Sequence, residues 1–151
     1  TTAKGLGNGI PIGACLMGSR ACNLFKPGNH GSTFGGNQLA CATALTVLEV
    51  IERDKLCDNA AKQGNLLKEM LMHQFNKHPA VKSIRGHGLM LGIELDRPAN
   101  DARLLGLKHG ILFNITAENV IRLLPPLIIN ETEVTKLVTR LTKTLTEFLE
   151  T

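Results

Sequence analysis

Residues 81–95 have the sequence VKSIRGHGLMLGIEL, and this stretch decides the fold of the second half of the chain. Two short apolar segments lie on either side of Gly86-His87-Gly88. Apolar segments of this length bounded by glycines are typical of strands joined by a turn. We therefore expect two short strands here.

Amphipathic helices are predicted on both sides of this stretch. Residues 59–75 repeat apolar side chains at i,i+4 spacing, which places them in one stripe of a helix. Residues 134–149 carry a second apolar stripe of this kind. Asn130 and Glu133 have the spacing of a capping box before it, in which each side chain satisfies a free N–H of the first turn.

The segment between the strands and the last helix completes a small unit. Residues 100–108 predict a short helix closed by Gly110, and residues 111–115 and 119–124 predict two further strands. From about residue 77 onward, the order of elements therefore predicts a compact α+β unit.

The first part of the chain has a different character. Residues 1–38 are rich in glycine, and short apolar segments at 10–12 and 14–17 are typical of buried strands between turns. Residues 39–51 (LACATALTVLEVI) are apolar on nearly all sides, which predicts a helix buried against a sheet.

These patterns predict an α/β protein in three parts. We expect residues 1–54 to be the end of a large α/β domain, residues 55–76 to be a connecting helix, and residues 77–151 to be a small α+β domain. The chain begins with Thr1 instead of Met, so we also expect it to be part of a longer polypeptide.

Composition narrows the classes of function. The chain has 151 residues, of which 43% are apolar and 20% charged, so collagen-like and disordered classes are excluded. No stretch reaches the roughly 20 apolar residues of a membrane helix, and there is no signal-peptide pattern. We therefore predict a soluble cytoplasmic protein with no membrane partner.

Neither a metal nor a nucleic acid is predicted as a ligand. The four cysteines and five histidines lack the spacing of chelating pairs, so no metal site is assigned. The formal charge of +4 comes from dispersed residues, and Trp and Tyr are absent, which argues against a nucleic-acid-binding surface.

Lys4 is the first candidate for chemistry. It lies among small residues that would let another molecule approach its amine, and a lysine amine can form a Schiff base with a carbonyl cofactor. Spacing alone favours the other interpretation, an exposed lysine near a chain end.

Residues 30–37, HGSTFGGN, lead directly into the predicted helix at 39–51. Hydroxyl groups and free N–H groups at a helix N-terminus favour a phosphate. A capped glycine-rich turn is the alternative interpretation.

Arg122 lies in an otherwise apolar run from Val120 to Ile129. A guanidinium in such surroundings must be paired, either with a ligand carboxylate through two parallel hydrogen bonds or with an acidic side chain of the protein. Both alternatives stay open, and Arg85 is more typical of the second.

Three segments in this order resemble the class-III aminotransferases: residues 2–14 (TAKGLGNGIPIGA), 28–37 (GNHGSTFGGN) and 114–126 (NITAENVIRLLPP). The resemblance covers the whole chain and is nearest to members that use N-acetylornithine and 2-oxoglutarate in arginine biosynthesis. It implies the C-terminal part of a fold-type I pyridoxal-phosphate-dependent transferase, with the end of the large domain followed by the small domain.

The resemblance also implies roles for four residues. Lys4 corresponds to the catalytic lysine that holds pyridoxal 5'-phosphate and moves the substrate proton. Thr33 corresponds to a residue that reaches the phosphate of the partner's cofactor in a homodimer with shared active sites, and Ser32 to a substrate contact there. Arg122 corresponds to the arginine that binds the substrate α-carboxylate.

The chain departs from the family pattern at one position, and the family pattern also predicts how active this chain is alone. Asn37-Gln38 stands where the family usually has Asn-Pro, which changes the start of the following helix. The other cofactor contacts of the family lie N-terminal to Lys4, so we expect negligible aminotransferase activity from this chain alone.

Alternative functions follow from the same residues. Other class-III aminotransferases act on ornithine, succinylornithine or 4-aminobutyrate. A non-catalytic structural or dimerisation module is a further possibility, and such a module should not leave the apolar face of the helix at 39–51 open.

Overall fold

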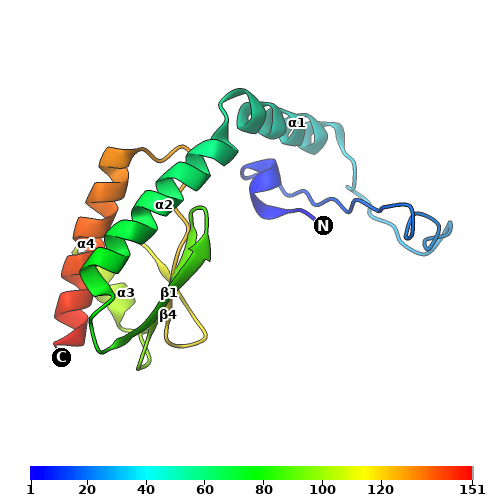
Figure 1. The fold of residues 1–151 in the computed structure, drawn as a ribbon. Helices are drawn as coiled ribbons and strands as arrows, with labels where there is room; N and C mark the ends of the chain where they lie inside the picture. The colour runs from blue at the N-terminus through cyan, green and yellow to red at the C-terminus, as the bar shows by residue number, and fades with distance from the viewer. Residues whose placement is uncertain (151) are drawn as a thin grey trace. The chain divides into compact units, whose positions relative to one another are not determined.

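The computed structural model describes residues 1–150 and contains two compact units, Thr1–Lys55 (unit 1) and Leu56–Thr151 (unit 2) (Figure 1). Unit 2 begins with α2 (Leu56–Phe75), which contacts α4 and the first strands of the sheet. The helix expected to connect two domains is thus a packed element of unit 2. The assignment of residues 1–54, 55–76 and 77–151 to the domains of a longer enzyme stays a prediction.

Unit 2 contains a four-stranded antiparallel sheet in the order β1-β2-β4-β3. Its strands are β1 (Val81–His87), β2 (Met90–Leu95), β3 (Asn114–Thr116) and β4 (Val120–Leu123). The two strands predicted within 81–95 are confirmed, but β1 continues through Gly86 and His87, and the turn lies at Gly88-Leu89. A Cβ on Gly86 would lie 2.1 Å from the Met90 carbonyl oxygen, so only glycine fits where the strands meet.

The second pair of strands is shorter than predicted. β3 and β4 form a hairpin in which Thr116 pairs with Val120, and Ala117 and Glu118 take left-handed backbone angles in the turn. Residues 111–113 precede the hairpin without joining the sheet. The predicted short helix is present as α3 (Ala102–Lys108), followed by Gly110 at a φ of 71°.

The last helix, α4 (Glu131–Leu149), begins as predicted. The Asn130 side chain accepts a hydrogen bond of 3.0 Å from the Glu133 N–H, and the Glu133 carboxylate accepts one of 2.9 Å from the Asn130 N–H. The capping box is therefore confirmed, and it fixes the first turn of α4.

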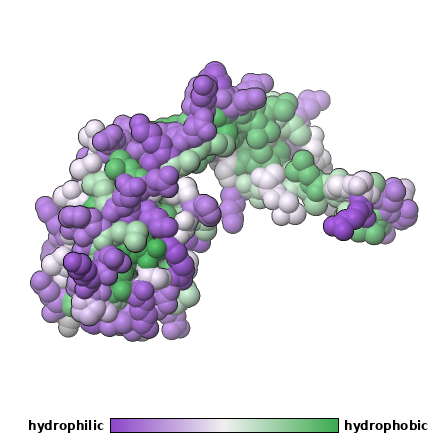
Figure 2. All heavy atoms as spheres, viewed as in Figure 1, coloured by the Kyte–Doolittle hydropathy of each residue, from purple (hydrophilic) through white to green (hydrophobic). Residues whose placement is uncertain are grey.

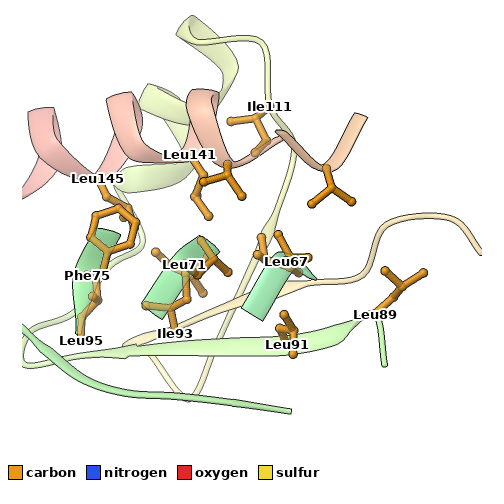
Figure 3. Packing of buried hydrophobic residues seen from close by; sticks show 14 of the residues in the cluster. Leu67, Leu71, Phe75, Leu89, Leu91, Ile93, Leu95, Ile111, Leu141 and Leu145 are labelled. Carbon is orange, nitrogen blue, oxygen red and sulfur yellow. The ribbon is translucent and has the colours of Figure 1, made fainter. Parts of the chain in front are cut away.

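The core of unit 2 lies between the helices α2 and α4 and one face of the sheet (Figure 3). The strands contribute every second side chain to this core, and the helices contribute apolar side chains three or four positions apart. The central ones are Leu67, Leu71 and Phe75 from α2, Leu91, Ile93 and Leu95 from β2, and Leu141 and Leu145 from α4. The opposite face of the sheet carries the other side chains of each strand.

Unit 1 contains a short 3-10 helix, η1 (Lys4–Gly7), and one long helix, α1 (Gln38–Arg53), which contact each other. The strands predicted at 10–12 and 14–17 are wrong: this region has an isolated bridge between Thr2 and Ala14, and residues 14–17 are exposed. An apolar run becomes a strand only beside a neighbouring strand, and unit 1 offers these runs no sheet to join.

Helix α1 is confirmed as a helix, but its predicted burial against a sheet is not observed within unit 1. Ala40 and Ala44 are buried, whereas Leu39, Leu45 and Leu48 are 68%, 60% and 52% exposed. Figure 2 shows hydrophobic surface gathered over α1.

Candidate active site

Lys4 begins the 3-10 helix η1 in an unusual backbone conformation. Its φ is 53°, in the left-handed region that non-glycine residues seldom adopt. The Thr2–Ala14 bridge, with two hydrogen bonds of 2.8 Å, holds the chain just before it. Strained residues of this kind concentrate at functional sites.

The Lys4 amine is available for chemistry. The side chain is exposed, and within residues 1–150 no carboxylate lies at ion-pair distance from it. The turn after η1 is compact, because a Cβ on Gly7 would lie 2.8 Å from Ile12 Cγ2. The segment therefore presents one exposed lysine amine, free of ion pairs within residues 1–150, on a small-residue loop.

Ser32 lines a pocket at the N-terminus of α1. The pocket has a volume of about 380 Å³ and is also lined by Gly35, Gly36 and Asn37. The Asn37 side chain accepts a hydrogen bond of 3.0 Å from the Ala40 N–H, so Asn37 is the N-cap and α1 begins at Gln38. A Cβ on Gly35 would lie 2.8 Å from the Ser32 Cβ, so glycine is required beside this serine.

Thr33 follows Ser32 and is exposed, but it does not line this pocket. Hydroxyl groups next to a helix N-terminus can donate to an anion that the helix dipole also attracts. The turn thus offers the Ser32 hydroxyl in the pocket and the exposed Thr33 hydroxyl beside it.

Arg122 lies on β4, on the sheet face opposite to the core. It pairs with Gly92 of β2 and Asn114 of β3, whereas its neighbours Ile121 and Leu123 are buried in the core. Arg122 itself is partly buried. It lines an open hollow of about 430 Å³, here called the sheet-face hollow, together with Arg85, Gly86, His87, Met90, Leu91, Gly92, Thr116 and Val120.

The Arg122 guanidinium has no acidic partner in the part of the chain that the structure describes. The alternative of an internal ion pair is therefore not observed there. An unpaired guanidinium in a mainly apolar hollow favours binding of a carboxylate.

Arg85, in contrast, is paired. Its guanidinium donates hydrogen bonds to the Glu94 carboxylate and the Ser83 hydroxyl, and Ser83 lies 3.1 Å from the same carboxylate oxygen. The hydrogen bond from Arg85, followed by that from Ser83, lowers the pKa of Glu94 below its ordinary value. The interpretation of Arg85 as a structural ion-pair residue is confirmed.

Two residues on the open face of the sheet, Gly92 in the sheet-face hollow and Glu94 outside it, were missed by sequence reasoning. Gly92 and Glu94 alternate with the buried Leu91, Ile93 and Leu95, and this alternation was the signal that could have placed them on the open face. The predicted site residues divide between the units, with Lys4, Ser32 and Thr33 in unit 1 and Arg122 in unit 2.

Residues 1–150 hold neither a cluster of metal ligands nor a membrane-spanning helix. No group of three His, Cys, Asp or Glu side chains gathers as a set of metal ligands. No helix in this range is long and apolar enough to cross a membrane.

The chain is similar in sequence to known aminotransferases. The chain is 49% identical over 150 residues to an acetylornithine aminotransferase of Nitrosomonas europaea, an alignment that covers 99% of this chain and 38% of that protein. It is 45% identical over 141 residues to the acetylornithine aminotransferase of Bacillus subtilis, covering 93% and 36%. The chain therefore spans little more than a third of these relatives.

Solved structures agree with the sequence relatives. An ornithine aminotransferase of Toxoplasma gondii matches with a TM-score of 0.78 and 39% identity, covering 84% of this chain and 31% of that one. An acetylornithine aminotransferase of Elizabethkingia anophelis matches with a TM-score of 0.75 and 37% identity, covering 82% and 34%.

The fold assignment is confirmed by these structures: the chain has the fold of a C-terminal part of such a transferase. The aminotransferase class-III family matches residues 1–145. The chain belongs to the class-III aminotransferase family.

Proposed function

We propose that this chain supplies part of the active site of an aminotransferase that moves an amino group between N-acetylornithine and 2-oxoglutarate. The observation that carries the proposal is the partly buried, unpaired Arg122 in the sheet-face hollow, because both substrates of such a reaction bear an α-carboxylate. The choice of N-acetylornithine is supported by the relatives from Nitrosomonas europaea and Bacillus subtilis.

Family membership implies pyridoxal 5'-phosphate as the cofactor. When bound, this cofactor supplies an electron sink that stabilises negative charge at the substrate α-carbon. The Lys4 side chain fits the group, since its amine is exposed, free of ion pairs and flanked by Gly5. Lys4 would hold the cofactor through its Nζ atom, and the same amine, once released from the cofactor, would take and return the substrate proton.

Ser32 and Thr33 complete the proposal in unit 1. Thr33 donates to the phosphate of a cofactor held by a partner subunit, and Ser32 contacts the substrate there. Their exposure and their place before the N-terminus of α1 support these roles. A homodimer with shared active sites is part of this proposal, and the cytoplasmic location stays a prediction.

Arg122 binds the α-carboxylate of either substrate through its two parallel N–H groups and so fixes the α-carbon relative to the cofactor. A second candidate is an ornithine aminotransferase, which the match to the Toxoplasma gondii enzyme favours. The two candidates share Lys4 and Arg122 and differ in the amino donor.

The experiment replaces the matching segment of the Nitrosomonas europaea acetylornithine aminotransferase with this chain. Transfer from N-acetylornithine and from ornithine to 2-oxoglutarate is then measured. We expect turnover with N-acetylornithine preferred, and a loss of at least about a hundredfold in Lys4→Ala, because the base and the cofactor anchor are removed together. Arg122→Gln should raise KM for both substrates.

Lys143→Ala, which removes an exposed lysine from α4, is the matched control and should keep its activity. Full activity of Lys4→Ala would overturn the proposal, and a preference for ornithine would favour the second candidate. The 151-residue chain alone should show no turnover.

A further inference from the structure

The open face of the sheet places two arginines on either side of a glycine. Arg85 pairs with Gly92 across β1 and β2, and Gly92 pairs with Arg122 across β2 and β4. Residues directly opposite each other in a sheet point to the same face, and neighbouring strands lie about 4.8 Å apart. The Cα atoms of Arg85 and Arg122 are thus roughly 10 Å apart on the same face.

Gly92 keeps the space between the two arginines open. Because it has no side chain, nothing from β2 fills the middle of this row. A Cβ at this position would already lie 3.2 Å from Val120 Cγ1. Arg85 and Arg122 both line one hollow, the sheet-face hollow of about 430 Å³.

The two arginines differ in their partners. Arg85 is engaged by Glu94 and Ser83, whereas Arg122 has no acidic partner among the described residues. The pKa of Glu94 is lowered by its hydrogen bond with Arg85, so this carboxylate is ionised at neutral pH. Glu94 therefore already accepts the Arg85 hydrogen bond that a second ligand carboxylate would need.

We propose that Glu94 determines specificity in the sheet-face hollow by holding Arg85, so that the hollow binds a single carboxylate, at Arg122. This inference rests on the carboxylate-binding role proposed above for Arg122. Glu94 is a positioning residue, because it acts through Arg85 and does not touch the ligand. Without its carboxylate, two guanidinium groups would face the hollow, and a dicarboxylate could be bound at both ends.

The test measures how the full chain binds a monocarboxylate and a dicarboxylate, with butyrate and glutarate as probes. Amide chemical shifts of the 151-residue chain report both the dissociation constants and the strands involved. In the unsubstituted chain, glutarate should bind at most about twofold more tightly than butyrate, the statistical advantage of two equivalent carboxylates, with shifts centred on β4. In Glu94→Gln, the preference for glutarate should rise further, up to about fivefold, the range of exposed ion pairs.

Two variants separate this effect from a general change in charge. Glu69→Gln removes a carboxylate from the exposed side of α2 and should leave the preference unchanged. Adding Arg85→Gln to Glu94→Gln should abolish the gain. Should Glu94→Gln lose the amide signals of the β1–β2 hairpin, Glu94→Ala is the second variant, with the same expected gain.

The inference and the proposed function fail in different ways. An unchanged preference in Glu94→Gln, or a gain that survives Arg85→Gln, would overturn the role of Glu94 while leaving Arg122 in place. Butyrate binding that persists in Arg122→Gln would instead overturn the carboxylate-binding role of Arg122.

Discussion

Unit 1 and unit 2 hold their candidate site residues by different means. Arg122 lies on a strand whose neighbours Ile121 and Leu123 are 0% and 3% exposed, so the core of unit 2 fixes its position. In unit 1 the buried apolar side chains are Ala40 and Ala44, and Lys4 is held by local hydrogen bonds and a strained backbone. The difference teaches that the candidate residue of unit 2 is positioned by packing and that of unit 1 by local geometry.

The same difference bears on the structural-module alternative. A self-contained module should cover the apolar face of α1, yet Leu39, Leu45 and Leu48 are each more than half exposed. Exposed apolar surface of this kind is typical of an interface. The observation therefore disfavours a self-contained module and agrees with membership of a larger enzyme.

The largest expected effect comes from removing a leucine from each unit. Leu71→Ala creates a cavity in the core of unit 2, where this side chain is 0% exposed, and should lower the free energy of unfolding by about 3 kcal/mol. Leu45→Ala, at a side chain 60% exposed, should change it by no more than about 0.5 kcal/mol. Urea unfolding followed by the amide signals of β2 measures both, and equal losses would show that the two units share one core.

The second expected effect is on the free energy of unfolding and compares a glycine of each unit. Gly64, inside α2, meets the β1–β2 turn so closely that a Cβ would lie 2.1 Å from the Gly88 carbonyl oxygen. Gly64→Ala should therefore force α2 away from the hairpin and lower the free energy of unfolding by about 2 kcal/mol, despite the better helix propensity of alanine. Gly5→Ala in η1, where no atom lies within 4 Å, is the matched control. A stabilised Gly64→Ala variant would contradict this close contact.

The sequence was most informative where structure is local. The capping box at Asn130 and Glu133 and the helix α4 were predicted because each depends on residues a few positions apart. The strands at 10–12 and 14–17 were wrong because a strand depends on a distant partner, which the apolar pattern alone does not identify.

The candidate site residues follow the same rule, in that local motifs indicated some of them and distant strand pairing placed the others. Lys4 and Arg122 were proposed from short motifs, and the structure adds the left-handed backbone of the first and, within residues 1–150, the lack of an acidic partner for the second. The row of Arg85, Gly92 and Arg122 was not predicted, because it depends on the register of three strands, β4 being separated from β2 by α3 in the sequence.

The smallest expected effect is a pH dependence that distinguishes two ion pairs. In unit 2, Glu147 of α4 accepts hydrogen bonds of 2.5 Å from Lys108 and 2.7 Å from His109, both at the end of α3. The hydrogen bond from Lys108, followed by that from His109, lowers the pKa of Glu147. In unit 1, the neighbouring Arg53 lowers the pKa of Asp54 in the same way.

The two ion pairs should affect the pH dependence of stability differently, because the partners of one are neighbours in the sequence and those of the other are not. A carboxylate with a lowered pKa in the folded state stabilises the fold above its ordinary pKa, and this contribution is lost as the pH falls through the lower, folded value. Glu147 meets Lys108 only in the folded chain, so Glu147→Gln should remove part of the loss of stability below about pH 4.5. Asp54 remains beside Arg53 in the unfolded chain, where the same pair can form, so Asp54→Asn should leave the profile unchanged. Urea unfolding from about pH 3 to 7 tests this, at low salt because salt screens exposed ion pairs. Identical stability profiles for Glu147→Gln and the unsubstituted chain would show that the contact between α3 and α4 does not depend on this carboxylate.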